Sequence, residues 1–142
     1  MGNIYINVGI AYQKQGELAE AEKYFWQAEA ICQRYSNVTE LARVQDNLGL
    51  LYFEQQQYHK SKTHFENALV TWQTLNNTYN KIQTLIFLAE CELREGSEQP
   101  AISRLVEAQE LLDQYGQTGP YRELREKAKK LLQLEQKTPV RL

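Results

Sequence analysis

The chain has 142 residues with a formal net charge of −2, and it is 42% hydrophobic and 24% charged. These values are typical of a single globular domain and exclude an overall positive field that would attract nucleic acid or an anionic membrane. Ala, Leu, Glu, Gln and Lys are abundant, strand-like alternation of apolar and polar residues is absent, and no apolar run is long enough to span a bilayer. The sequence therefore predicts an all-α protein.

Apolar spacing and capping residues predict six helices in chain order, followed by a seventh. Asn37 or Thr39 is expected to cap the third helix, Asn77 or Thr78 the fifth, and Ser97 the sixth. The first, second, fourth and seventh helices are expected over about residues 3–15, 18–35, 58–75 and 121–136, and the third, fifth and sixth should end near residues 56, 95 and 115. Residues 116–120 should break the chain, because they contain two glycines and a proline.

A pattern recurs along these helices at intervals of forty residues. A small residue follows an apolar one at Gly9, Gly49 and Ala89. A small–large–small series runs in step with it: Ala21, Phe25, Ala28; Ser61, Phe65, Ala68; and Ala101, Leu105, Ala108. A glycine inside a helix costs about 1 kcal/mol relative to alanine, so another helix is expected to approach closely at the glycines.

This pattern resembles the tetratricopeptide repeat, whose first helix carries an aromatic residue, Leu-Gly and Tyr, and whose second carries Ala, Phe and Ala. Here the first helix reads Tyr5, Val8-Gly9 and Tyr12, and the third copy is degenerate because Glu92 replaces the Tyr. The usual period is about 34 residues, whereas the forty-residue unit is similar to those of kinesin light chains and of bacterial signalling and regulatory proteins. The six extra residues are expected to lengthen the helices rather than to form loops.

The resemblance implies a right-handed α-solenoid of three helix–turn–helix units with a C-terminal capping helix. The expected segments are repeat 1 over 1–36, repeat 2 over 37–76, repeat 3 over 77–117, the capping helix over 118–136 and a frayed tail over 137–142. The chain is also expected to be a segment of a larger bacterial regulatory protein, or else a short natural protein.

The resemblance further implies a protein–protein interaction scaffold that binds an apolar-rich peptide or helix in a concave groove lined by the first helices. Carried onto this chain, the groove residues are Ile6, Asn7, Ile10, Arg43, Asp46, Asn47, Leu50, Phe53, Ile86, Phe87, Glu90 and Arg94. Phe53 and Phe87 are the expected anchors, and Asn7 and Asn47 are expected to hydrogen-bond the ligand. Five positions would match the carboxylate clamp of chaperone-binding members, and only Asn47 is retained there, which argues against chaperone tails as ligands.

No pattern in the chain predicts catalysis, a metal site or a cofactor. His59 and His64 are five residues apart and are interpreted as solvated surface side chains. Cys32 and Cys91 lack a motif partner and are expected to be buried free thiols, which fits a reducing, cytoplasmic compartment. We therefore predict that the protein is not an enzyme.

Two alternatives concern the ends of the chain. Residues 121–142 carry seven Lys/Arg against three Glu, so the last helix is either a solvated cap or a surface for nucleic acid or an acidic partner. Ile4, Tyr5 and Val8 would be exposed at the first repeat, which favours a homodimer or a self-assembly module that stacks through the repeat ends.

Glu92 is expected to pair with one of the basic residues of the last helix: Arg122, Arg125 or Lys129.

Overall fold

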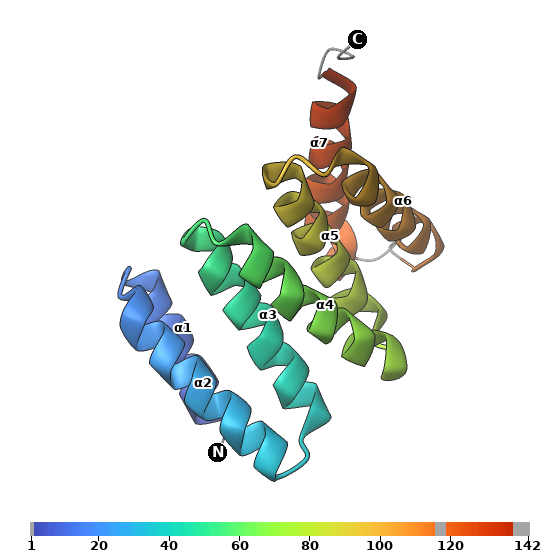
Figure 1. Cartoon of the computed structure of the whole chain (residues 1–142). Helices are drawn as coiled ribbons and strands as arrows, with labels where there is room; N and C mark the ends of the chain where they lie inside the picture. Colours follow the sequence, from blue (N-terminus) through green and yellow to red (C-terminus); the bar gives the residue numbers. More distant parts are fainter. Residues whose placement is uncertain (1, 116–118, 138–142) are drawn as a thin grey trace. The chain divides into compact units, whose positions relative to one another are not determined.

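The computed structural model describes residues 2–115 and 119–137, and every regular element in these residues is helical (Figure 1). The elements are α1 (Gly2–Lys14), α2 (Leu18–Arg34), α3 (Val38–Glu54), α4 (Tyr58–Thr74), α5 (Thr78–Arg94), α6 (Glu98–Tyr115), the short 3-10 helix η1 (Gly119–Tyr121) and α7 (Arg122–Lys137). The prediction of an all-α fold is confirmed. Met1 and most of the expected tail, residues 138–142, lie outside the described residues.

The forty-residue period is visible in the helix boundaries. The second helices of the three repeats begin at Leu18, Tyr58 and Glu98. Each of α2, α3, α4 and α5 has 17 residues, and only short turns separate them. The residues that exceed the usual period therefore lie inside the helices, as predicted.

The chain divides into two compact units, which we describe separately. Unit 1 ends at Asn76 and contains α1 to α4, in which α1 packs against α2, α3 against α4, and α2 and α1 against α3. Unit 2 begins at Asn77 and contains α5 to α7, in which α7 packs against both members of the α5–α6 pair. We call α1, α3 and α5 the A helices and α2, α4 and α6 the B helices.

Five turns of three residues join the first six helices, and the middle residue of each is left-handed. These residues are Gly16, Ser36, Gln56, Asn76 and Gly96, with φ between 54° and 83°. In the first turn the N–H of Glu17 donates to the carbonyl of Tyr12 at 2.9 Å, and the N–H of Gly16 donates to Gln13 at 3.0 Å. These two hydrogen bonds satisfy carbonyl groups at the end of the helix, and the chain reverses its direction sharply there.

Side chains cap the helices that follow two of these turns. The Asn37 side chain accepts from the N–H of Glu40, and the Asn77 side chain accepts from the N–H of Asn80, each at 3.1 Å. Of the residues predicted as caps, Asn37 and Asn77 fill the role rather than Thr39 and Thr78.

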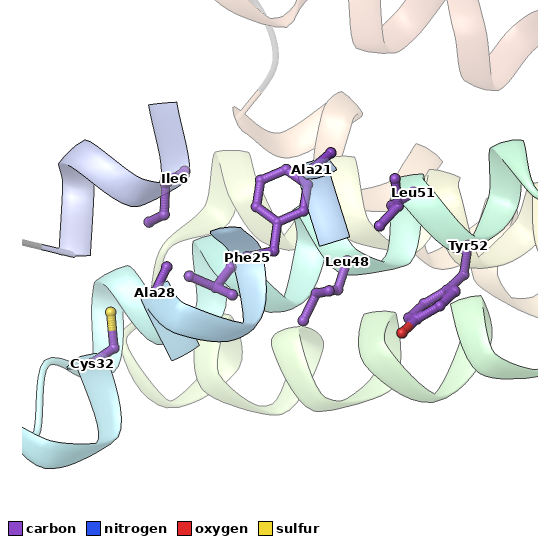
Figure 2. Close-up of a cluster of buried hydrophobic side chains, with 9 residues drawn as sticks. Ile6, Ala21, Phe25, Ala28, Cys32, Leu48, Leu51 and Tyr52 are labelled. Atoms are coloured by element: carbon purple, nitrogen blue, oxygen red, sulfur yellow. The ribbon is translucent and has the colours of Figure 1, made fainter. Parts of the chain in front are cut away.

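Within each repeat, the core is built on contact between a small A-helix residue and a large B-helix residue. A Cβ atom added to Gly9 would lie 2.6 Å from the Phe25 ring, and one added to Gly49 would lie 2.6 Å from the Phe65 ring. Figure 2 shows Phe25 among the buried side chains of repeat 1 and the start of repeat 2. The close approach predicted at the two glycines is confirmed, and the group that lies against each glycine is the phenylalanine ring of the B helix.

Candidate interaction surface

We give the name A-face to six positions of each A helix: Asn3, Ile6, Asn7, Ile10, Gln13 and Lys14 in α1, the residues forty positions later in α3, and the residues eighty positions later in α5. The structure places ten of the twelve predicted groove residues there with some side-chain exposure: Asn7 and Arg94 are exposed, and Ile10, Arg43, Asp46, Asn47, Leu50, Phe53, Phe87 and Glu90 are half-buried.

The prediction that two of the residues line the groove is wrong. Ile6 and Ile86 are fully buried and have no surface to offer a ligand. Each lies three residues before the small position of its A helix, so it shares the stripe that packs inward. Ile6 belongs to the same core cluster as Phe25 and Ala28 of α2.

Two hydrogen bonds link α1 to α3 across the A-face of unit 1. Arg43 Nη1 donates to Asn3 Oδ1 at 2.7 Å, and Gln13 Nε2 donates to Glu54 Oε1 at 2.7 Å. Both bonds join residues about forty positions apart, so α1 and α3 run side by side in register. Ten residues separate the two bonds along α1, which corresponds to about 15 Å of helix.

Apolar side chains occupy the A-face between these two bonds. Ile10 and Leu50 hold equivalent positions and are half-buried, and Ile10 packs against the core cluster of unit 1. Phe53 is half-buried as well and meets the Tyr58 ring edge-on, with ring centroids 5.4 Å apart. The contact fixes the Phe53 ring at the surface, so it would lose little rotational freedom on binding a ligand.

The polar residues of the same face mostly make contacts within the protein. Asp46 Oδ2 accepts from Trp72 Nε1 at 2.8 Å, and Asn47 Nδ2 donates to the Arg43 carbonyl at 2.9 Å. Arg43 also pairs with Glu40 at 3.2 Å. Asn7, by contrast, is exposed. Asn7 and Asn47, which occupy equivalent positions in the sequence, therefore differ in what they can offer a ligand.

A cavity of about 330 Å³ lies in unit 1 beside the Asn3 end of the A-face. It is lined by Gly2, Asn3, Ile31, Cys32, Tyr35, Asn37 and Glu40. Ile31 and Tyr35 give it apolar walls, and Asn3 and Glu40 belong to the hydrogen-bonded group around Arg43.

In unit 2, α7 covers part of the A-face of α5. Lys127 Nζ lies 4.8 Å from the centroid of the Phe87 ring and forms a salt bridge of 2.9 Å with Glu90. Lys127 stands forty residues after Phe87, so α7 continues the A-helix register. The second predicted anchor therefore lies beneath a cation of the last helix.

A polar and aromatic network that was not predicted from the sequence lies on the opposite side of α3, where three residues of α2 meet repeat 2. Tyr52 donates to Glu22 at 2.8 Å, and Gln45 Nε2 donates to Glu29 at 3.1 Å. The third contact is edge-on, between the Trp26 and His64 rings, whose centroids are 5.7 Å apart.

His64 is the centre of this network, which corrects its interpretation as a solvated side chain. Its ring stacks on Tyr52 with centroids 5.3 Å apart, and its Nδ1 lies 2.7 Å from Gln45 Oε1. Since the Gln45 amide nitrogen donates to Glu29, its oxygen is left to accept, and His64 Nδ1 carries the hydrogen. Burial lowers the pKa of His64, raises that of Glu29, and raises the pKa of Tyr52 to about 12.

The repeat register relates this network to the other repeats. Tyr12 and Tyr24, Tyr52 and His64, and Glu92 and Arg104 occupy the same two positions in repeats 1, 2 and 3. The first two pairs stack, and the third is a salt bridge of 3.4 Å whose carboxylate is buried. The series is visible in the sequence when residues 24, 64 and 104 are compared.

Glu92 thus forms the partly buried ion pair that the sequence predicted, but with Arg104 of α6, a partner the prediction did not name. The basic residues Arg122, Arg125 and Lys129 line a hollow of about 500 Å³ together with Gln109 and Glu126. Arg122 pairs with Glu126 there at 3.4 Å.

In the described part of the chain, no group of three or more His, Cys, Asp or Glu side chains is arranged to hold a metal ion. Cys32 and Cys91 are buried free thiols, and burial raises the pKa of Cys32. None of the helices described is both long and apolar enough to cross a membrane.

Pairs of helices that recur every forty residues, with a small A-helix residue against a large B-helix residue, define an α-helical repeat protein. The family model of the tetratricopeptide repeat matches residues 1–69 and 40–114. The chain therefore belongs to the tetratricopeptide repeat family. No curated protein sequence matches it.

Solved structures support the same fold. BtubC (BKLC) from P. vanneervenii has 23% sequence identity and a TM-score of 0.78, over 84% of this chain and 49% of that chain. This chain therefore spans about half the length of BtubC. The N-terminal domain of stress-induced protein-1 (STI-1) from C. elegans has 17% identity and a TM-score of 0.69, over 92% of this chain and 94% of that chain.

Proposed function

We propose that this protein is a non-catalytic scaffold whose A-face binds an apolar-rich peptide or helix of another protein. Tetratricopeptide repeats generally mediate protein–protein interaction. Binding of an apolar-rich ligand at the A-face is supported above all by the group of Ile10, Leu50 and Phe53, which lies at the surface of unit 1 between two hydrogen-bonded pairs. Apolar centres with polar rims are typical of protein interfaces.

Phe53 is the main anchor in this proposal. Its ring is held by Tyr58 but remains partly exposed, and aromatic side chains often dominate interface energetics. Phe87 offers a second apolar surface in unit 2, but a ligand must share it with Lys127 or displace the ammonium group. Phe87 is therefore expected to contribute less than Phe53.

Polar groups at the rim would set the register of the ligand. Asn7 can donate to and accept from a peptide backbone, whereas the Asn47 amide nitrogen already donates to its own helix. The cavity beside Asn3 can take one apolar ligand side chain between Ile31 and Tyr35. Few charges would be neutralised on binding, so affinity should change little with salt. The two buried free thiols support a reducing, cytoplasmic setting for this function.

The test is to select peptides from a displayed library on the folded chain and to measure the best one by calorimetry. Phe53→Ala should weaken binding by about 2 kcal/mol or more, and Phe87→Ala should weaken it less. Val70→Ala, at a position that is 63% exposed on α4, is the matched control and should bind normally. Unchanged affinity of a folded Phe53→Ala/Phe87→Ala protein would place the site elsewhere.

A further inference from the structure

Repeat 1 exposes side chains that repeat 2 buries at the same positions. Ile4 is 64% exposed, whereas Val44, forty residues later, is fully buried. Val8 is half-buried where Leu48 is fully buried, and Tyr12 is half-buried where Tyr52 is 4% exposed. Among the described residues, the outer side of repeat 1 thus presents the positions that repeat 2 uses in its contact with repeat 1.

Three tyrosines dominate this outer side, and we call them the tyrosine face. Tyr24 of α2 stacks between two rings of α1, with its centroid 5.4 Å from that of Tyr12 and 6.2 Å from that of Tyr5. Among the described residues, no hydrogen bond engages the hydroxyl groups of these three tyrosines. The face therefore offers an aromatic surface with three O–H donors at its edges.

The equivalent face of repeat 2 shows what such a surface accepts. Its residues Gln45, Tyr52 and His64 correspond to Tyr5, Tyr12 and Tyr24. They meet a single helix, α2, through three side chains spaced i, i+4 and i+7: Glu22, Trp26 and Glu29. The first and last are carboxylates that accept hydrogen bonds, and the middle one presents its ring edge-on.

The same pattern of donors is present on the tyrosine face. Tyr12 carries a hydroxyl group at the position of the Tyr52 hydroxyl, which donates a hydrogen bond to Glu22. The Tyr5 hydroxyl replaces the Gln45 amide as the donor for the carboxylate at i+7, and Tyr24 replaces His64 as the ring beneath the aromatic residue at i+4. Both hydrogen bonds would be to charged acceptors, which are stronger than bonds between neutral groups.

We propose that the tyrosine face binds an amphipathic helix of a partner protein that carries a carboxylate, an aromatic residue and a second carboxylate at positions i, i+4 and i+7. This site is distinct from the A-face. It uses the other side of α1 together with Tyr24 of α2, so the two sites can be occupied by different ligands.

One carboxylate on repeat 1 should weaken the binding of this ligand, and its replacement provides a second test of the proposal. In repeat 2, Lys60 Nζ lies 5.4 Å from the centroid of the Tyr52 ring. The equivalent residue in repeat 1 is Glu20, which would repel the carboxylate at position i. Glu20→Lys should therefore strengthen binding.

The probe is a synthetic peptide with the sequence of residues 18–34, which contains Glu22, Trp26 and Glu29 at the required spacing. Ala21→Lys and Phe25→Asp are joined by a lactam that holds the helix, and Cys32→Ser removes the thiol. Because Phe25 is the ring that packs on Gly9, the peptide cannot replace α2 in the protein core. Fluorescence anisotropy of the labelled peptide, titrated with the full chain, reports binding.

The expected result is saturable binding that falls at least tenfold with Tyr5→Phe/Tyr12→Phe, which removes two hydroxyl groups and keeps the rings. Binding should rise with Glu20→Lys, fall with a peptide carrying Trp26→Ala, and stay unchanged with Tyr115→Phe, a control for an exposed tyrosine of α6. Absence of binding to the unaltered chain, or equal binding to Tyr5→Phe/Tyr12→Phe, would overturn the proposal. So would sedimentation that shows a dimer abolished by Tyr5→Phe/Tyr12→Phe, since a second copy would then be the occupant.

Discussion

The contact between small and large residues in each repeat predicts a strong coupling between Gly49 and Phe65. A Cβ atom at position 49 would lie 2.6 Å from Phe65 Cε1, well inside van der Waals contact. Repeat 3 has Ala89 and Leu105 at these positions, packed in one buried cluster. The alanine methyl group is thus present only where the large residue is a leucine rather than a phenylalanine.

The magnitudes follow from two opposing terms. Gly49→Ala gains about 1 kcal/mol of helix propensity but overpacks the core at a cost of about 1–3 kcal/mol, so a net loss of about 1 kcal/mol is expected. Phe65→Leu leaves unfilled space and should cost about 1–2 kcal/mol, less than truncation to alanine. In the double variant the methyl group fills that space, so we expect a coupling of about 2 kcal/mol and stability close to that of the unaltered protein.

Urea denaturation followed by far-ultraviolet circular dichroism gives the free energy of unfolding of all four proteins in this cycle. The reverse exchange in unit 2, Ala89→Gly with Leu105→Phe, is the matched control and should show a coupling of the same sign. Additive effects within about 0.5 kcal/mol, or stabilisation by Gly49→Ala alone, would refute the claim that ring contact explains the recurring small and large residues.

Three further predictions concern individual contacts. Burial lowers the pKa of His64 below its ordinary value of 6.5, so the unfolded chain takes up the proton first and stability is lost as the pH falls through that value; His64→Tyr, which copies Tyr24, should flatten the urea midpoint between pH 7.5 and 5.5, and an unchanged slope would exclude His64 as the cause. Arg104→Leu should cost about 2–3 kcal/mol because it removes a partner of the buried Glu92 carboxylate, and Glu92→Leu/Arg104→Leu should recover most of that loss in the same assay. Asn37→Ala should cost about 1 kcal/mol through loss of the cap on α3, and thermal unfolding that matches the parent protein would contradict that role.

The sequence predicts the helices and the repeat register well, because the small–large–small series at forty-residue spacing leaves few other ways to bury the apolar faces. It fails at Ile6 and Ile86 because two stripes of an A helix lie only one residue apart in sequence, and periodicity alone does not say which one packs inward. The partner of Glu92 was missed for a related reason. Position 24 of repeat 1, 64 of repeat 2 and 104 of repeat 3 carry different residue types, Tyr, His and Arg, so the series does not stand out by composition.

The exposure of A-face residues could not be predicted from side-chain type either. Asn7 and Asn47 are the same residue type at equivalent repeat positions, but Asn7 is exposed, whereas Asn47 is half-buried and donates a hydrogen bond to the Arg43 carbonyl. Likewise, Phe87 matches the pattern of a surface anchor, and its cover by Lys127 depends on where α7 packs. Such differences arise from tertiary contacts that the repeat pattern does not encode.

Binding of an apolar-rich segment to the A-face of unit 1 is tested most directly by backbone amide NMR spectra of the chain during titration with a selected peptide. If the segment binds there, the largest chemical-shift changes should fall on α1 and α3, at Asn7, Ile10, Leu50 and Phe53, with small changes at Val70 of α4. Changes confined to the B helices, or to Tyr5, Tyr12 and Tyr24, in the presence of saturating peptide would contradict binding at the A-face.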